Sequence, residues 1–274
     1  MNGKIILLSE KVIKEYLKHH VSRASAALAY FLMLTVFPLL ICLYAMLGNL
    51  FPSAQELSGL LRGFLPVATV DIIMEFLGYV SANSSLRMVS VALVAMATSS
   101  AAGFRIIDKL LFELREHKAG KGMIPFAFSF LFSLVFLAAL YLSAVLMVSG
   151  GWFISFADKY IKGLNISQSW EWFRFIILFM LLYVMIMGVY KVCSPRGREV
   201  ILVPGAFFAA VATVLISILF SWFIGLSVKY PLVYGSLASV MIMMFWLYIC
   251  GNIVFIGGLI NIGLEGLIQS GESH

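Results

Sequence analysis

The amino-acid sequence predicts an all-α protein, a polytopic membrane helical bundle of about six transmembrane helices with both ends on the cytoplasmic side. Of its 274 residues, 62% are hydrophobic and only 12% are charged, whereas a soluble domain averages roughly 45–50% apolar and ~25% charged residues. So few charges cannot cover a water-facing surface, and most of the surface must therefore face lipid. The Lys and Arg residues also gather on alternate connections between apolar runs, as in a multi-pass protein.

Six apolar runs approach the ~20 residues that a spanning helix needs. The second is the weakest, because it is apolar only over 88–104 and reaches full length by including Arg105 and Asp108. We expect spans at about 25–50, 88–108, 124–148, 173–192, 201–226 and 232–264.

Two of these runs contain residues that disturb a straight helix. Pro38 lies midway along the first run, where the missing N–H predicts a kink. The last run would be about 50 Å long as a helix, which exceeds the ~30 Å hydrocarbon core. It must therefore tilt, project beyond the bilayer, or break near Gly251, Gly257 and Gly258.

The distribution of Lys and Arg predicts the orientation. The N-terminal segment and the second and fourth connections carry 13 of these residues, and the opposite side carries 6. The richer side is expected in the cytoplasm, and an even number of spans then places the C-terminus there as well. This divides the chain into an N-terminal segment (1–24), a transmembrane domain (25–266) and a cytoplasmic tail (267–274).

Two segments outside the spans have helical periodicity. Residues 4–20 place apolar side chains on one face and lysines elsewhere, which favours a basic amphipathic helix in the membrane interface; an ordinary solvated helix is the alternative. Residues 54–83 form two short apolar-faced pieces separated by Pro66, which predicts an amphipathic hairpin on the extracytoplasmic face.

Small residues recur every fourth position along the fifth span. Such a stripe lets helix backbones approach closely, and its hydroxyls can bond across the contact. Packing within the chain is favoured over packing against a second copy, although both remain open. The stripe comprises Gly205, Ala209, Thr213, Ser217, Ser221 and Gly225.

A few polar side chains within the spans are candidates for a substrate site. Arg105 and Asp108 lie three residues apart near the end of the second span, so they can pair with each other. They serve either as a structural anchor or as a functional polar site. Asn252 and Asn261 need partners within lipid, either on neighbouring helices or in a hydrated cavity.

The sequence contains no recognisable catalytic or metal-binding pattern. Cys42, Cys193 and Cys250 are far apart, and no HExxH, GxSxG or phosphate-loop motif occurs. The acids are scattered through the connections instead of clustering as nuclease ligands would. We therefore expect no enzymatic activity, no cofactor, no metal and no nucleic-acid partner.

Several short motifs together resemble the YihY/BrkB family of bacterial inner-membrane proteins, over nearly the whole chain. Tyr234 belongs to one of them, and is for that reason a further candidate site residue. The motifs are Ala26-Ala27-Leu28-Ala29-Tyr30-Phe31, Phe37-Pro38-Leu39, Ser194-Pro195, Val203-Pro204-Gly205-Ala206, Val233-Tyr234-Gly235-Ser236-Leu237, Phe245-Trp246-Leu247-Tyr248 and Gly257-Gly258-Leu259-Ile260-Asn261.

The chain also departs from the family pattern at two positions. Many members have an acidic residue where this chain has Leu259, and Asp108 stands where members tend to have an amide. A mechanism that relies on the missing carboxylate is therefore in doubt for this chain. The added charge of Asp108 is able to pair with Arg105.

The resemblance implies a location in the bacterial cytoplasmic membrane and a link to envelope integrity. The family's former label as ribonuclease BN is regarded as mistaken, and a role in moving lipid-like molecules has been suggested. Our leading hypothesis is a transporter of a lipid or amphiphilic envelope component, with membrane lipids as partners. The alternatives are a scaffold that binds partner helices, a homo-oligomer included, and an intramembrane enzyme.

Overall fold

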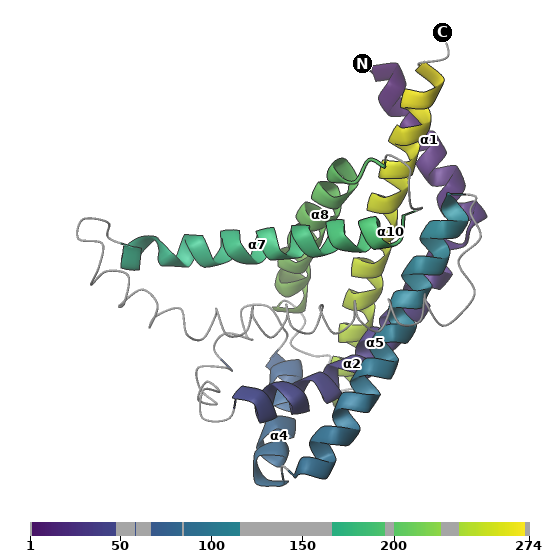
Figure 1. Cartoon of the computed structure of the whole chain (residues 1–274). Helices are drawn as coiled ribbons and strands as arrows, with labels where there is room; N and C mark the ends of the chain where they lie inside the picture. The colour runs from purple at the N-terminus through teal and green to yellow at the C-terminus, as the bar shows by residue number, and fades with distance from the viewer. Residues whose placement is uncertain are drawn as a thin grey trace.

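The computed structural model describes residues 2–47, 58, 67–83, 85–115, 166–194, 200–225 and 236–271. The regular elements in these ranges are α-helices, which confirms the predicted fold class (Figure 1). The predicted span 124–148, Tyr234 and most of the first half of the hairpin lie outside the described residues. The helices are α1 (Asn2–Lys18), α2 (Val21–Leu47), α4 (Val67–Asn83), α5 (Leu86–Leu114), α7 (Ile166–Val192), α8 (Val203–Gly225) and α10 (Ser236–Gly271).

Four of the described helices are long and apolar enough to cross a membrane. Large apolar side chains remain exposed along them, such as Val91 on α5 at 69% and Ile218 on α8 at 62%. A protein surrounded by lipid is expected to expose apolar side chains on this scale. The candidate spans are Val21–Cys42, Leu86–Leu114, Val203–Phe220 and Val240–Leu267.

The helices pack around α10. It lies against α2 on one side and α8 on another, while α5 runs along α2 and α1 lies along the C-terminal part of α10. The start of α1 and the end of α10 therefore lie together at one end of the bundle (Figure 1). Figure 1 also shows α7 running across α8 and α10 instead of alongside them. The crossing of the bilayer by α7 stays a prediction.

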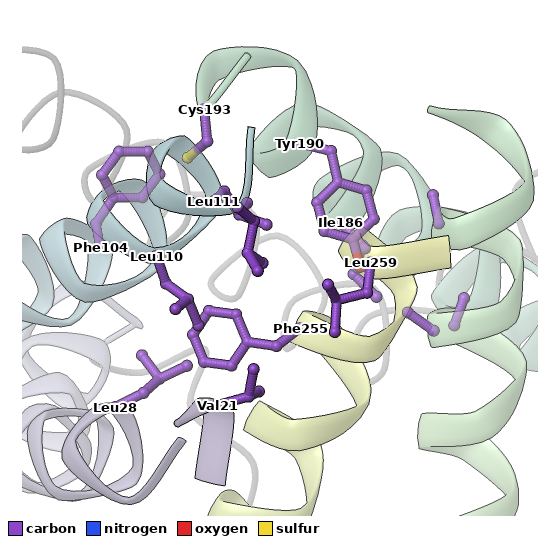
Figure 2. Close-up of a cluster of buried hydrophobic side chains, with 14 residues drawn as sticks. Val21, Leu28, Phe104, Leu110, Leu111, Ile186, Tyr190, Cys193, Phe255 and Leu259 are labelled. Atoms are coloured by element: carbon purple, nitrogen blue, oxygen red, sulfur yellow. The ribbon is translucent and has the colours of Figure 1, made fainter. Parts of the chain in front are cut away.

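The largest buried cluster joins α2, α5, α7, α8 and α10 (Figure 2). Phe255 of α10 is fully buried near its centre, and Tyr190 of α7 is 1% exposed. Leu110 and Leu111 approach from α5, and Val21 and Leu28 approach from α2. Five helices separated in sequence are thus held together by this one apolar core.

The two long helices continue through the residues expected to disturb them. α2 includes Pro38 without ending there, so a kink stays a prediction. α10 is continuous from Ser236 to Gly271, so the break considered at its glycines does not occur. Its 36 residues correspond to a length of about 54 Å. The helix must therefore tilt in the bilayer or project beyond it.

The two amphipathic segments supply apolar faces to the bundle. In α1, Val12 and Tyr16 pack on the core, whereas Ile13 and Leu17 are exposed at 60% and 66%. α4 buries Val70, Ile73, Leu77 and Val80, which share one helical face, and contacts α2 and α10. Contact of either helix with a membrane interface stays a prediction.

Candidate functional site

The backbones of α8 and α10 meet where two glycines face each other. A Cβ atom added to Gly205 would collide with the carbonyl oxygen of Gly257, and one added to Gly257 would lie 2.5 Å from the carbonyl oxygen of Gly205. Ala209, one turn further along α8, is fully buried. Glycine is required here because no side chain fits between the two backbones.

Asn261 of α10 caps the N-terminus of α8. The first N–H groups of a helix have no carbonyl partner within the helix, and a Ser, Thr, Asp or Asn side chain usually supplies one. Leu202, which precedes α8, has an apolar side chain and cannot accept a hydrogen bond from these N–H groups. Instead, the Gly205 N–H donates to Asn261 Oδ1 at 2.7 Å, and Asn261 Nδ2 donates to the Leu202 carbonyl at 3.1 Å. Asn261 is fully buried.

One helical turn further along α10, Glu265 forms a buried ion pair with Arg115. Arg115 Nη2 lies 3.3 Å from Glu265 Oε1, and the two side chains are only 6% and 13% exposed. The same carboxylate oxygen accepts the Ile201 N–H at 3.0 Å, and Arg115 Nη1 donates to the Cys193 carbonyl at 3.4 Å. This Arg115–Glu265 junction therefore ties together the ends of α5, α7 and α10 and the segment that leads into α8.

The C-terminal end of α7 is fixed by polar contacts on both sides. The Tyr190 hydroxyl donates to the Val254 carbonyl of α10, and the Ser194 hydroxyl donates to the Tyr190 carbonyl. The Cys193 thiol is fully buried near the Asp108 side chain of α5. Burial, and then the nearby Asp108 carboxylate, raises the pKa of the Cys193 thiol well above its ordinary value.

A second polar group, which we call the hydroxyl cluster, lies where α1, α2 and α10 meet. It consists of Tyr16, Ser22, Tyr248 and Asn252. The Tyr16 hydroxyl donates to Asn252 Oδ1 at 2.7 Å, Asn252 Nδ2 donates to the Tyr248 carbonyl at 2.8 Å, and the hydroxyls of Ser22 and Tyr248 are 2.7 Å apart. Ser22 is exposed, and the other three side chains are partly buried.

The structure places the predicted polar candidates in three different surroundings. Asn261 belongs to the α8 cap and Asn252 to the hydroxyl cluster. Asp108 lies near Cys193, which directly follows α7, and Arg105 is exposed on α5. Their roles as substrate-site residues stay predictions.

The stripe of small residues faces α10 over part of its length. Gly205 and Ala209 lie against Gly257, and the Trp246 Nε1–H donates to the Ser217 hydroxyl at 3.3 Å. Ser217 in turn donates to the Thr213 carbonyl. Ser221 and Gly225 complete α8, and their side-chain positions fall outside the description.

Sequence reasoning missed several residues that the fold brings together. Arg115 and Glu265 are 150 positions apart, so no local pattern predicts their pairing. The lack of a capping residue before Val203 was a usable signal, because it implies a cap from elsewhere in the fold. The other missed residues are Tyr16, Ser22, Tyr190 and Tyr248.

Comparison with known proteins identifies the family. A family model described as "Virulence factor BrkB" matches residues 12–273 of the chain. The chain belongs to the BrkB virulence factor family. This extent includes all the described helices except the first part of α1, so the α8 cap, the Arg115–Glu265 junction and the hydroxyl cluster are parts of a BrkB-family domain.

Relatives of this BrkB-family chain include YfkH of Bacillus subtilis, which carries the name of a ribonuclease-like protein. It is 23% identical over 255 residues, covering 92% of this chain and 93% of YfkH. A UPF0761 membrane protein of Actinobacillus pleuropneumoniae is 26% identical over 263 residues, covering 93% and 92% of the two chains. One of Idiomarina loihiensis is 28% identical over 233 residues, covering 81% and 71%. No solved structure matches the chain.

Proposed function

We propose that this membrane protein transports a lipid or an amphiphilic envelope component and is not an enzyme. The observation that carries the proposal is that the hydroxyl cluster reaches the protein surface next to an exposed apolar side chain. Its exposed member, Ser22, is the second residue of α2, and the ring of Phe245 on α10, which packs on Tyr248, is 55% exposed. Hydrogen-bonding groups beside lipid-facing apolar side chains can receive a headgroup while its acyl chains stay in the bilayer.

The distribution of buried charge supports an uncharged pathway. In the described part of the chain, the buried ion pair joins Arg115 and Glu265 at the helix ends, away from the middle of the spans. Carboxylates and other ionisable groups at mid-membrane depth are typical of ion-coupled pumps and proton relays. An ion pair at the helix ends instead has the structural role of holding the helices together at one end of the bundle.

The scaffold alternative would use the small-residue stripe of α8 to bind partner helices. The structure supports this less well, because α10 already occupies the stripe at Gly205 and Ala209 and bonds to Ser217 through Trp246. What α8 presents outward is bulky and apolar, including Ile218, Leu219 and Trp222 at 57% to 67% exposure. Such a surface suits contact with acyl chains.

Reconstitution into vesicles tests the proposal. Phospholipids and glycolipids with fluorescent acyl chains are placed in both leaflets, and a membrane-impermeant quencher then reports how fast the inner pool reaches the outside. We expect faster exchange than in protein-free vesicles and in vesicles that hold heat-denatured protein. Exchange equal to both controls for every labelled lipid would contradict the transport function.

A further inference from the structure

The geometry points to the hydroxyl cluster as the binding site for a neutral headgroup that carries several hydroxyl groups, such as the sugar of a glycolipid. This inference rests on the proposed function, because it names the class of amphiphile handled at the same site. It concerns Tyr16, Ser22, Tyr248 and Asn252, which three helices bring together from positions up to 236 residues apart.

The cluster is a connected chain of hydrogen bonds. The Ser22 hydroxyl lies 2.7 Å from the Tyr248 hydroxyl, Asn252 donates to the Tyr248 carbonyl, and the Tyr16 hydroxyl donates to Asn252. A chain of this kind orients each hydroxyl by means of its neighbours, so the free lone pairs point in defined directions. The site is therefore arranged before a ligand arrives.

The hydrogen-bonding capacity of the cluster exceeds what its internal bonds use. A hydroxyl offers one donor and two acceptor lone pairs, and an amide offers two donors and two lone pairs. The bonds described above use one N–H of Asn252 and leave lone pairs on the oxygens of Ser22 and Tyr248 at the exposed edge. The remaining groups include both donors and acceptors, which is the pattern that a sugar or polyol hydroxyl satisfies.

The cluster itself carries no charge at neutral pH. Burial and the neighbouring Tyr248 raise the pKa of Tyr16, so its phenol stays protonated and remains a donor. A phosphate group would be bound most strongly by a guanidinium or by several backbone N–H groups, and the four side chains include none of these. These four side chains themselves thus suit a neutral headgroup better than an anionic one.

Aromatic rings lie beside the hydroxyls, and the apolar face of a sugar ring can pack against such rings. The rings of Phe245 and Tyr248 are stacked with centroids 6.4 Å apart, and Phe220 lies 6.2 Å from Phe245. The Phe245 ring is 55% exposed, so a ligand can reach it. The hydroxyls can bind the polar part of an amphiphilic ligand, and the aromatic rings beside them can bind its apolar part.

Native mass spectrometry of the full chain in a detergent without sugar groups tests the inference. The probes are monoglucosyl diacylglycerol, phosphatidic acid and diacylglycerol with identical acyl chains. We expect monoglucosyl diacylglycerol to bind most tightly. At the exposed position of Ser22, the nearly isosteric pair Ser22→Thr and Ser22→Val separates the hydroxyl from the shape of the side chain. Val should weaken glucolipid binding roughly fivefold to tenfold relative to Thr, with no change for the other two lipids.

Two hydroxyls outside the cluster supply matched controls. Ser90 and Thr98 are exposed on α5 and bond to carbonyls of their own helix, so Ser90→Ala and Thr98→Ala should leave glucolipid binding unchanged. Equal affinity for all three lipids, or equal affinity of the Ser22→Thr and Ser22→Val proteins, would overturn the inference.

The vesicle experiment separates this inference from the proposed function. Hydroxyl-dependent glucolipid binding without any lipid exchange would refute transport and leave the headgroup site in place. Lipid exchange without hydroxyl-dependent binding would refute the headgroup site and leave transport in place.

Discussion

Asn261 of α10 accepts the backbone N–H of Gly205 in α8 at 2.7 Å, so one helix provides the N-terminal cap of another. The cap explains how α8 begins with Val203 and Pro204 although no capping residue precedes it. Because Glu265 lies one turn along the same face of α10 and accepts the Ile201 N–H, two side chains of α10 position the entry to α8.

The first prediction concerns this cap. Replacing Asn261 with Leu removes both hydrogen bonds and leaves the Gly205 N–H buried without an acceptor. We expect a loss of roughly 1–3 kcal/mol in the free energy of unfolding, measured by SDS titration of the purified protein. Thr98→Ala, which removes an exposed hydroxyl bonded within its own helix, should change stability by less than about 0.5 kcal/mol. Equal stability of the two variants would refute the capping role.

The second prediction concerns the glycine contact between α8 and α10. Gly257→Ala places a Cβ 2.5 Å from the Gly205 carbonyl oxygen, so the helices must separate. Overpacking of this kind should cost roughly 1–3 kcal/mol of stability. Gly78 in α4 is the control, because a Cβ there would meet nothing within 4 Å, and Gly78→Ala should raise stability by up to about 1 kcal/mol through helix propensity. Effects of the same sign in both variants would contradict the close packing.

The third prediction concerns the buried ion pair. Removing one partner, as in Glu265→Leu, leaves the Arg115 charge buried and should destabilise the protein by roughly 3–5 kcal/mol. The double variant Arg115→Met with Glu265→Leu should recover part of that loss. The exposed pair of Lys109 and Glu113, with side chains 74% and 47% exposed, is the control, and Lys109→Met should cost no more than about 1 kcal/mol. Additive losses in the double variant would show that Arg115 and Glu265 act independently.

The fourth prediction concerns pH. Because the pKa of Cys193 is raised in the folded protein, the unfolded chain loses this proton first as the pH rises through about 8.5. The contribution to stability is complete below that pH and falls above it, by at most ~1.4 kcal/mol per pH unit. Unfolding free energies of the wild type should therefore decline more steeply between pH 8 and 10 than those of Cys193→Ala. Parallel curves for the two proteins would contradict a buried neutral thiol.

The architecture could be predicted from the sequence because lipid imposes strong local constraints. Long apolar runs and few charges predict membrane helices, and four described helices meet that requirement. The stripe that begins at Gly205 predicts close helix packing, because small residues at every fourth position let a neighbouring backbone approach one face of the helix. The partner helix could not be predicted, because many apolar helices would fit such a stripe.

The polar contacts could not be predicted from local patterns. The sequence predicts that Asn261 needs a partner, but the partner is a backbone N–H that becomes available only where α8 begins. Arg115 and Glu265 stand near the ends of separate helices, where an isolated charge is unremarkable. The hydroxyl cluster requires the return of α10 past the junction of α1 and α2, which only the tertiary fold establishes.

The most direct test of the transport function is the exchange rate of a fluorescent glucolipid in vesicles that hold the Ser22→Thr or the Ser22→Val protein. The account predicts rapid exchange with Thr and roughly fivefold to tenfold slower protein-dependent exchange with Val, although both proteins unfold at the same SDS concentration. Identical exchange in protein-free vesicles and in vesicles with either variant or the wild type would contradict it.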